Sequence, residues 1–234
     1  MKNVFLLFLV ITVLGACANK QQNFSVTQIS KKELSQEFTY KGSFLQAWQW
    51  KDKNGKNILI LSTNNKLVKV EDIDDSASTR ELFARQYVVR KDVNPKILWE
   101  MYDFENSCTV DLTAEFIGVP TFTDLDNDSI AESFIIYRLS CRGDISPSTM
   151  KVIEHEGKNK YALRGRMYVK ADEGSPEALD MKTWEPDLSK ITRSKDDWKS
   201  ADGRYENAND FINAPPSFLE KAKELWMENV NEKF

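Results

Sequence analysis

The sequence has few of the residues on which most enzymes and nucleic-acid-binding proteins depend. It contains a single histidine, and it lacks the G-x-S-x-G and H-E-x-x-H motifs and a glycine-rich phosphate loop. Basic residues are not in excess, since 32 Lys and Arg face 36 Asp and Glu for a net charge of −4. Without a basic patch, nucleic acid is not an expected partner. No internal repeat is present, which argues against a propeller.

Long hydrophobic runs are also missing, except for one at the N-terminus. Lys2 precedes an apolar stretch over residues 4–14, and Leu14-Gly15-Ala16-Cys17 follows. A short apolar run of this kind, ending in small residues, is typical of a signal peptide (residues 1–16) and too short for a membrane span. Cysteine directly after Leu-Gly-Ala is typical of the lipobox of bacterial lipoproteins. We therefore expect lipidation at Cys17 and a polar tether over residues 17–25; a secretory signal with a chance cysteine is the alternative.

Cysteine is otherwise scarce, because only Cys108 and Cys141 remain beyond Cys17. An even pair in an oxidising envelope predicts a disulfide, with two buried free thiols as the alternative. Ala18 stands in place of Asp after the lipidated cysteine. By resemblance to the sorting rules of lipoproteins, this implies an outer-membrane lipoprotein of the cell envelope, facing either the periplasm or the surface.

The remaining chain is typical of a mainly β protein: an antiparallel sheet built of hairpins with a C-terminal helix packed on it. The apolar segments 44–50 and 58–61 flank Asn54-Gly55, which predicts a hairpin with a type I′ turn. Segments 82–89 and 97–104 alternate and predict a second hairpin, and segments 150–154 and 161–169 predict another. Segment 110–116 alternates as a strand with one polar face, and 134–141 is expected to be a central strand because it is apolar on both faces.

The last part of the chain is different in character. Residues 26–170 form the predicted β domain, whereas residues 171–234 are a polar extension that ends in a helix. Ser217 and Glu220 predict a capping box at the start of this helix. Its apolar side chains fall on one face at helical spacing and are expected to pack on the sheet; they are Phe218, Ala222, Leu225, Trp226 and Val230.

An acidic loop at residues 124–132 is the strongest candidate site. Its ligand positions follow the order of a calcium loop: the side chains of Asp124, Asp126 and Asp128, the carbonyl of Ile130, and the carboxylate of Glu132. We predict a structural Ca²⁺ here, although an exposed acidic turn held by Asx hydrogen bonds is the alternative. Ser129 occupies the position that usually holds glycine, so it is expected to adopt a left-handed conformation at a cost of about 1–2 kcal/mol. A second acidic stretch, 71–79, is interpreted as a solvated turn.

The cysteines and the acidic loop suggest one hairpin. If strands 108–116 and 133–141 pair across the loop so that Val110 faces Leu139, then Cys108 faces Cys141 and the apolar partners share one face. The disulfide would then close the open end of this hairpin, and the cation would hold its loop. The histidine, His155, lies between two glutamates on a predicted strand and is interpreted as a surface residue.

The spacing D-x-D-x-D-x-x-x-E resembles the calcium loops of integrin-type propeller repeats more than the EF-hand. The run from Thr121 to Gly165, TFTDLDNDSIAESFIIYRLSCRGDISPSTMKVIEHEGKNKYALRG, resembles a family of Gram-negative envelope lipoproteins labelled as surface polysaccharide biosynthesis proteins. Weaker agreement extends upstream through Tyr40-Lys41-Gly42 and Leu98-Trp99 to Cys108. The resemblance implies a role in lipopolysaccharide or capsule production and carries over no catalytic residue.

These observations predict a lipid-anchored, non-enzymatic envelope protein that supports surface polysaccharide biosynthesis or assembly. Its expected partners are the membrane, through the lipid, and an envelope glycan or a polysaccharide assembly protein. The alternative is a glycan-active enzyme that uses a pair of carboxylates, because acidic residues are plentiful, although the sequence distinguishes no particular pair.

Overall fold

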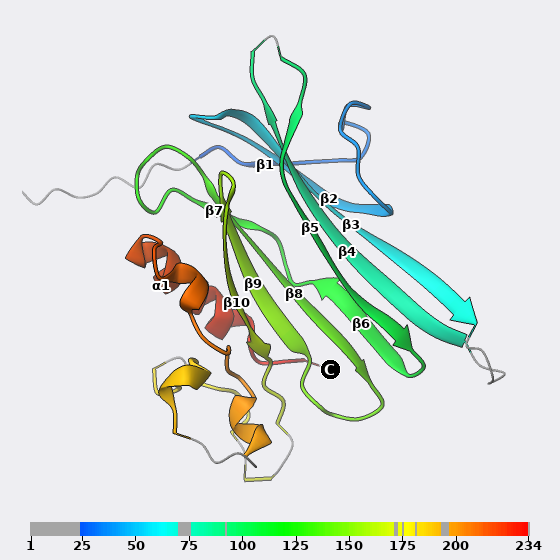
Figure 1. The fold of residues 1–234 in the computed structure, drawn as a ribbon, viewed down its shortest axis with the longest axis vertical. Helices are drawn as coiled ribbons and strands as arrows, with labels where there is room; N and C mark the ends of the chain where they lie inside the picture. The colour runs from blue at the N-terminus through cyan, green and yellow to red at the C-terminus, as the bar shows by residue number, and fades with distance from the viewer. Residues whose placement is uncertain are drawn as a thin grey trace, which may run out of the picture.

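The structure is a computed structural model, and it describes residues 24–69, 76–91, 93–170, 173–174, 176–180, 182–192 and 197–233. The expected signal peptide, Cys17 and most of the tether lie outside the described residues, as does most of the acidic stretch 71–79. The described residues form two antiparallel sheets, one α-helix and three short 3₁₀ helices (Figure 1), which confirms the mainly β prediction.

The first sheet has the strand order β1-β2-β3-β4-β5, so each strand pairs with its neighbour in sequence. Its strands are β1 (Thr27–Ile29), β2 (Ser43–Asp52), β3 (Gly55–Lys69), β4 (Ser76–Val89) and β5 (Lys96–Cys108). The second sheet has the order β10-β9-β8-β6, and β7 also pairs with β8. Its strands are β6 (Asp111–Phe116), β7 (Thr121–Thr123), β8 (Glu132–Arg142), β9 (Thr149–Glu156) and β10 (Asn159–Arg166).

The two sheets pack against each other through one face of each. In β3, Leu59 and Leu61 point into the core between the sheets, whereas Ile58 and Ile60 point into a second core on the outer face of the first sheet. Successive side chains of a strand lie on opposite faces, so a continuous apolar run such as 58–61 requires cover on both sides. The outer cover of the first sheet comes from the segment before β2, where Phe38 is buried.

The outer face of the second sheet is covered by α1 (Pro216–Asn229), as Figure 1 shows. The predicted apolar face of the helix is confirmed, because Phe218, Ala222, Leu225, Trp226 and Val230 are all buried. The predicted capping box is wrong. The helix begins at Pro216, which suits a first helical turn because it has no N–H to satisfy. Within the described residues, no helix is long and apolar enough to cross a membrane.

The segment between β10 and α1 also packs on the second sheet. It contains three short 3₁₀ helices, η1 (Leu188–Lys190), η2 (Trp198–Ala201) and η3 (Asn209–Phe211). Leu179, Tyr205 and Phe211 from this segment are buried with α1 in one core. Gly165 in β10 permits the contact, because a Cβ at this position would lie 2.0 Å from the carbonyl oxygen of Arg204. The polar segment therefore shares its core with the β strands.

The first hairpin forms as predicted, but its turn differs. Asp52 pairs with Gly55, so the two turn residues are Lys53 and Asn54. The type I′ prediction is wrong. A type I′ turn requires positive φ at both central residues, and neither Lys53 nor Asn54 has a positive φ. The positive φ in this turn belongs to Gly55, at 131°. The predicted hairpins β4–β5 and β9–β10 are confirmed, as is the central position of the strand at 134–141 in its sheet.

The predicted register of the strands around the acidic loop is wrong by four residues. Leu112 faces Cys141 and Ala114 faces Leu139. The cause is β7, which occupies the pairing positions of β8 nearest the loop (Thr121 faces Phe134) and shifts β6 further along. A shift by an even number keeps the same side chains on the buried face, so the alternation in 110–116 cannot reveal it.

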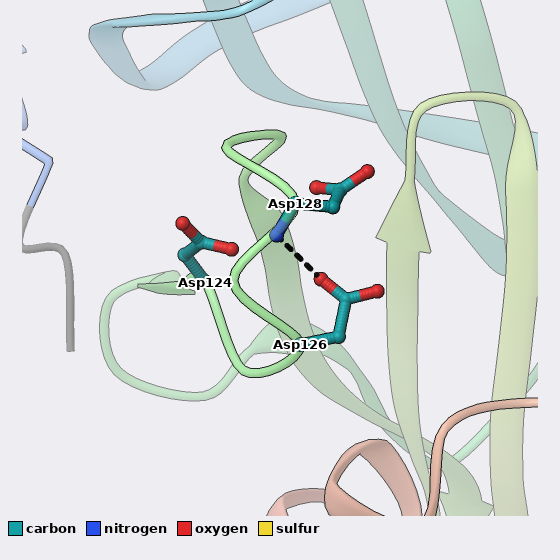
Figure 2. A group of neighbouring side chains, drawn as sticks. All are labelled: Asp124, Asp126 and Asp128. Atoms are coloured by element: carbon teal, nitrogen blue, oxygen red, sulfur yellow. Dashed lines mark hydrogen bonds between the residues drawn. The ribbon is translucent and has the colours of Figure 1, made fainter. Parts of the chain in front are cut away.

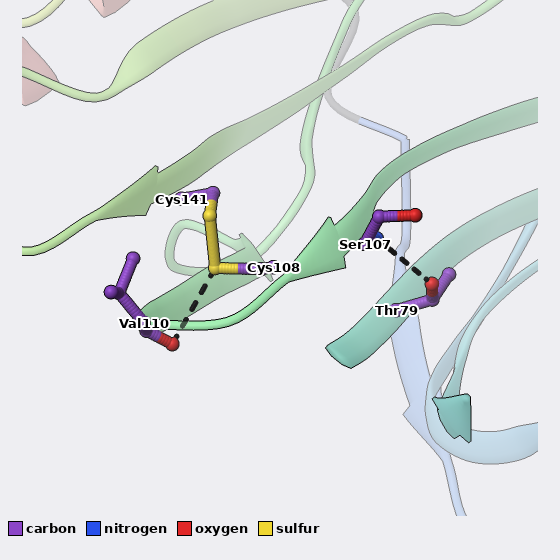
Figure 3. The surroundings of a disulfide bond; sticks show 5 residues. All are labelled: Thr79, Ser107, Cys108, Val110 and Cys141. Atoms are coloured by element: carbon purple, nitrogen blue, oxygen red, sulfur yellow. Dashed lines mark hydrogen bonds between the residues drawn. A yellow bond between two sulfur atoms is a disulfide. The ribbon is translucent and has the colours of Figure 1, made fainter. Parts of the chain in front are cut away.

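The disulfide between Cys108 and Cys141 is present, with its Cα atoms 5.5 Å apart (Figure 3). It does not close a hairpin. Cys108 ends β5 of the first sheet and Cys141 lies near the end of β8 of the second, so the bond joins the two sheets. Ser107, with φ 53°, turns the chain just before Cys108.

Candidate metal centre

The acidic loop connects β7 to β8 and brings three aspartates together. One carboxylate oxygen from each of Asp124, Asp126 and Asp128 lies within 4.8 Å of the others. Figure 2 shows the three side chains arranged around the loop. Carboxylate oxygens at this spacing are the ligands that Ca²⁺ and other hard cations prefer. The predicted convergence of the three aspartates is confirmed, and they could hold a metal ion.

Hydrogen bonds between side chains and backbone hold the loop in its curved form. The amide of Asp128 donates to Oδ1 of Asp126 (3.1 Å), and the amide of Ile130 donates to Oδ1 of Asp128 (2.7 Å). Asn127 and Ser129 have φ values of 62° and 70°. The left-handed conformation predicted for Ser129 is therefore confirmed.

Asp124 is the most buried of the three aspartates, with 1% of its surface exposed. Its Oδ1 accepts a long hydrogen bond from the amide of Ser129 (3.4 Å), and its Oδ2 has no partner among the described residues. Burial is the main cause that raises the pKa of Asp124, and the charges of Asp128 and Asp126 add to it. A bound cation would remove both penalties, since it replaces the lost water and offsets the repulsion.

The loop touches both sheets and the helix. The amide of Lys53, in the β2–β3 turn, donates to the carbonyl of Ser129 (2.9 Å), and the amide of Ala131 donates to Oδ2 of Asp52 (3.3 Å). From α1, the hydroxyl of Ser217 lies 3.5 Å from the carbonyl oxygen of Leu125. An ion bound in this loop would therefore stabilise the junction of three elements.

Glu132, the predicted ligand at the end of the loop, belongs to a neighbouring group. It forms a second cluster of carboxylate oxygens with Asp126 and Glu156, again within 4.8 Å of one another. Its carboxylate also accepts hydrogen bonds from Oγ1 of Thr123 (2.7 Å) and from the amide of Leu125 (3.0 Å). Burial is the main cause that raises its pKa to about 7. Ligation by Glu132 and by the carbonyl of Ile130 remains a prediction.

Two glutamates of β9 were missed in the sequence and contribute to this region. Glu156 pairs directly with Glu132 across the sheet, and Glu154 lies two residues away on the same face. Glu154 is fully buried, neither of its carboxylate oxygens has a hydrogen-bond partner among the described residues, and burial raises its pKa to about 9. The alternation E-H-E at 154–156 was the available signal for these glutamates. It does not by itself show that they lie beside Glu132, because that depends on the β8–β9 register.

His155 lies on the opposite face of β9, and its interpretation as a surface residue is wrong. It is 4% exposed and stacks on Trp99 in the core between the sheets. Its Nδ1 is 3.1 Å from the carbonyl oxygen of Asn159. Burial lowers its pKa to about 4, so it is a neutral core residue at physiological pH.

A second feature is a basic cleft of about 930 Å³ between β9, β10 and the 3₁₀ segments. The four cationic side chains that line it, together with Glu206, are Lys151, Arg164, Arg166 and Arg204. Arg204 stacks on the ring of Trp184, at 3.7 Å from the ring centroid, and donates to the carbonyl of Glu185 (2.9 Å). This stacking fixes the guanidinium in place, as suits the recognition of an anion.

Acidic residues outside the cleft lining form ion pairs with three of these cations. Arg164 pairs with Asp210 (2.9 Å), Arg166 with Asp202 (3.2 Å), and Lys151 with Asp103. Of these acids, none lines the cleft itself. The pairs therefore orient the cations, and the described lining of the cleft carries more positive than negative side chains in a protein whose net charge is negative.

Comparisons of the chain with protein-family models, with curated proteins and with solved structures found no match.

Proposed function

We propose that this protein is a lipid-anchored, non-enzymatic component of the cell envelope that supports surface polysaccharide biosynthesis or assembly, with a structural calcium ion in its acidic loop. The observation that carries the calcium proposal is the position of the loop, where three aspartates meet at the junction of both sheets and α1. A cation at this position stabilises the fold and leaves the rest of the surface available for a partner.

Calcium suits the loop better than magnesium. Three aspartates with a carbonyl and Glu132 offer more oxygens than the octahedral shell of Mg²⁺ accepts, and Ca²⁺ takes six to eight. The left-handed residues Asn127 and Ser129 curve the backbone so that the aspartates converge. No part of this arrangement needs a substrate, which supports a structural role.

The basic cleft is the proposed contact with the glycan. Its cations suit the carboxylate or phosphate groups of an acidic polysaccharide, because guanidinium groups bind such oxygens in pairs. Leu188 and Ile191 add apolar surface, and Ser189 adds a hydroxyl. The partner expected from this chemistry is an anionic saccharide.

The alternative is a glycan-active enzyme with a carboxylate pair. Such enzymes place two carboxylates about 5–9.5 Å apart on either side of the sugar. Among the described residues that line the basic cleft, Glu206 is the one carboxylate. The carboxylate pair of Glu132 and Glu154 is fully buried, so a sugar could not reach it. This distribution favours binding over hydrolysis.

Binding of oligosaccharides to the purified protein tests the proposal. Calorimetry with an oligogalacturonate, using a neutral maltooligosaccharide of the same length as control, should give saturable binding only for the acidic sugar. Arg166→Gln should weaken it roughly tenfold or more, since a hydrogen bond to a charged group contributes about 1.5–3 kcal/mol. Arg90→Gln, an exposed arginine outside the cleft, is the matched control. Equal binding of both sugars, or reducing ends released from the acidic one, would contradict the proposal.

A cellular experiment tests the envelope role. Deletion of the gene should change the amount or length of the surface polysaccharide, and Cys17→Ala should reproduce this change if the lipid is needed. The mass of the purified protein would show the acyl chains. An unaltered glycan profile in the deletion strain would exclude a role in polysaccharide assembly.

A further inference from the structure

We propose that the protein holds a second divalent cation, bound by Glu132, Glu156 and Asp126 beside the acidic loop and next to the buried Glu154 on the same face of the sheet. Asp126 belongs to both carboxylate groups and would bridge the two ions. The inference rests on the proposed calcium loop through this shared residue and through Glu132, which the sequence also assigns to the loop. The expected ions are oxygen-preferring cations of the Ca²⁺ class.

The sheet itself builds the site. Glu132 opens β8 and Glu156 ends β9, and the two are directly opposite each other in the register. Like charges directly opposite on neighbouring strands are destabilising. Here they lie on the buried face beneath the loop, where the penalty is larger than at a surface. A cation between them converts this repulsion into attraction.

Glu154 is an independent observation that points to a ligand. Its side chain is completely buried, and both Oε atoms are without a hydrogen-bond partner in the described chain. Glu154 lies on the same face of β9 as Glu156, which faces Glu132 across the sheet. Oε1 of Glu156 is also buried and has no partner there. A buried carboxylate without hydrogen bonds is costly unless it is neutralised or coordinates a metal.

The described residues offer these carboxylates no basic counter-charge. Six carboxyl groups meet in this region, and none of them has an ion pair with Lys or Arg in the described part of the chain: Asp124, Asp126, Asp128, Glu132, Glu154 and Glu156. Lys53 reaches only the backbone carbonyl of Asp128 (3.5 Å). A cation in the loop would offset the aspartates there and leave the facing Glu132 and Glu156 without a counter-charge, so a second ion is the natural complement.

The site also has access to solvent and a firm framework. Asp126 is exposed and Glu156 is half-buried, so a cation can enter from the surface. Glu132 is held by Thr123 and by the amide of Leu125, which orients its carboxylate as the partners of metal ligands usually do.

Counting bound ions tests the inference. Full-length protein is treated with a chelator and dialysed against Ca²⁺, and the metal content per chain is measured. The wild type should bind two ions. Glu156→Gln, which touches only the second site, should bind one, and so should Asp128→Asn, which touches only the loop. Asp126→Asn should weaken both, and Glu228→Gln on α1, an exposed acid outside the cluster, should leave both ions in place.

The outcomes separate the two proposals. One ion in the wild type, unchanged by Glu156→Gln, would overturn the second site and leave the loop site intact. No ion in the wild type would overturn both. If Glu156→Gln does not fold, crystals of the wild type soaked in Mn²⁺ decide instead, because two anomalous peaks that share Asp126 support the inference and a single peak contradicts it.

Discussion

The imidazole of His155 lies flat on the indole of Trp99, with ring centroids 3.8 Å apart and planes 7° from parallel. The stack joins β9 of the second sheet to β5 of the first. Trp99 continues into a buried chain of hydrogen bonds, because its Nε1 donates to Gln86 (2.7 Å) and Gln86 donates to Asn57 (3.0 Å). The histidine therefore has a packing role between the sheets.

The burial of His155 in this stack predicts that its contribution to stability depends on pH. The pKa of His155 falls from 6.5 to about 4 on folding, so the unfolded chain binds the proton more tightly. The contribution of His155 to the free energy of unfolding should be fully present above pH 6.5, and roughly 3 kcal/mol of it should be lost towards pH 4. In His155→Phe, urea unfolding should lack this component. If the difference between variant and wild type does not change with pH, the histidine is not buried in its neutral form.

The disulfide predicts a large loss of stability on reduction. Cys108 and Cys141 are 33 positions apart, and in the chain-entropy model a loop of this size stabilises by about 3–4 kcal/mol. The double variant Cys108→Ser/Cys141→Ser should therefore melt about 6–15 °C lower. Thiol titration of the unreduced, denatured wild type should find neither sulfur free, and reactive thiols at both positions would refute the bond.

Calcium should stabilise the chelator-treated protein. At 100 times the dissociation constant, binding to the native state contributes about 2.7 kcal/mol per site, or about 5–10 °C in melting temperature. Asp128→Asn should remove much of this increment and leave the calcium-free fold largely intact, because the disulfide still joins the sheets. A melting temperature that does not respond to millimolar calcium would mean that the loop is only an acidic turn.

Glu232 should be essential for the attachment of the C-terminal segment. Its fully buried carboxylate pairs with Arg138 (3.0 Å) and Arg142 (2.7 Å) and accepts a hydrogen bond from the amide of Ser148 (2.9 Å). Removing one partner of a buried ion pair typically costs about 3–5 kcal/mol, and Glu232→Ala should approach this range although Arg138 keeps Glu115.

Acid should have a related effect through the same carboxylate. Hydrogen bonds from Arg142 and Ser148 outweigh burial and hold the pKa of Glu232 below 4.5. Its stabilising contribution is present above that value and is lost as the pH falls through the lowered pKa. Comparing acid unfolding of the wild type with Glu232→Gln checks this, and identical curves below pH 4.5 would contradict it.

Periodicity predicted the parts of the fold that depend on local pattern. The alternating faces of the strands and the apolar stripe of α1 follow from which side chains must be buried. The acidic loop was equally readable, because its three aspartates and Ser129 lie close in sequence. The register between distant segments could not be predicted. A four-residue shift preserves the buried face, so the sequence showed neither β7 nor the pairing of Leu112 with Cys141.

The same limit explains the errors at the site. Glu154 and His155 read as polar strand residues, and only the packing of the second sheet between the first sheet and α1 buries both faces of β9. Ser217 is of a residue type that is common at the N-cap, yet the helix begins at Pro216. The hydroxyl of Ser217 approaches the acidic loop instead. In each case a tertiary contact overrides a local preference.

Two connections between the sheets lie at opposite ends of β8. The acidic loop is at the Glu132 end, and the disulfide is at the Cys141 end. If two sheets are connected at one end only, the other end can separate and expose the strand edges to proteases and to strands of other molecules. Because these two sheets are connected at both ends of β8, they can separate only by sliding past each other or by complete unfolding. Partly opened forms should therefore be rare, and proteolysis should begin at the loops outside the sheets.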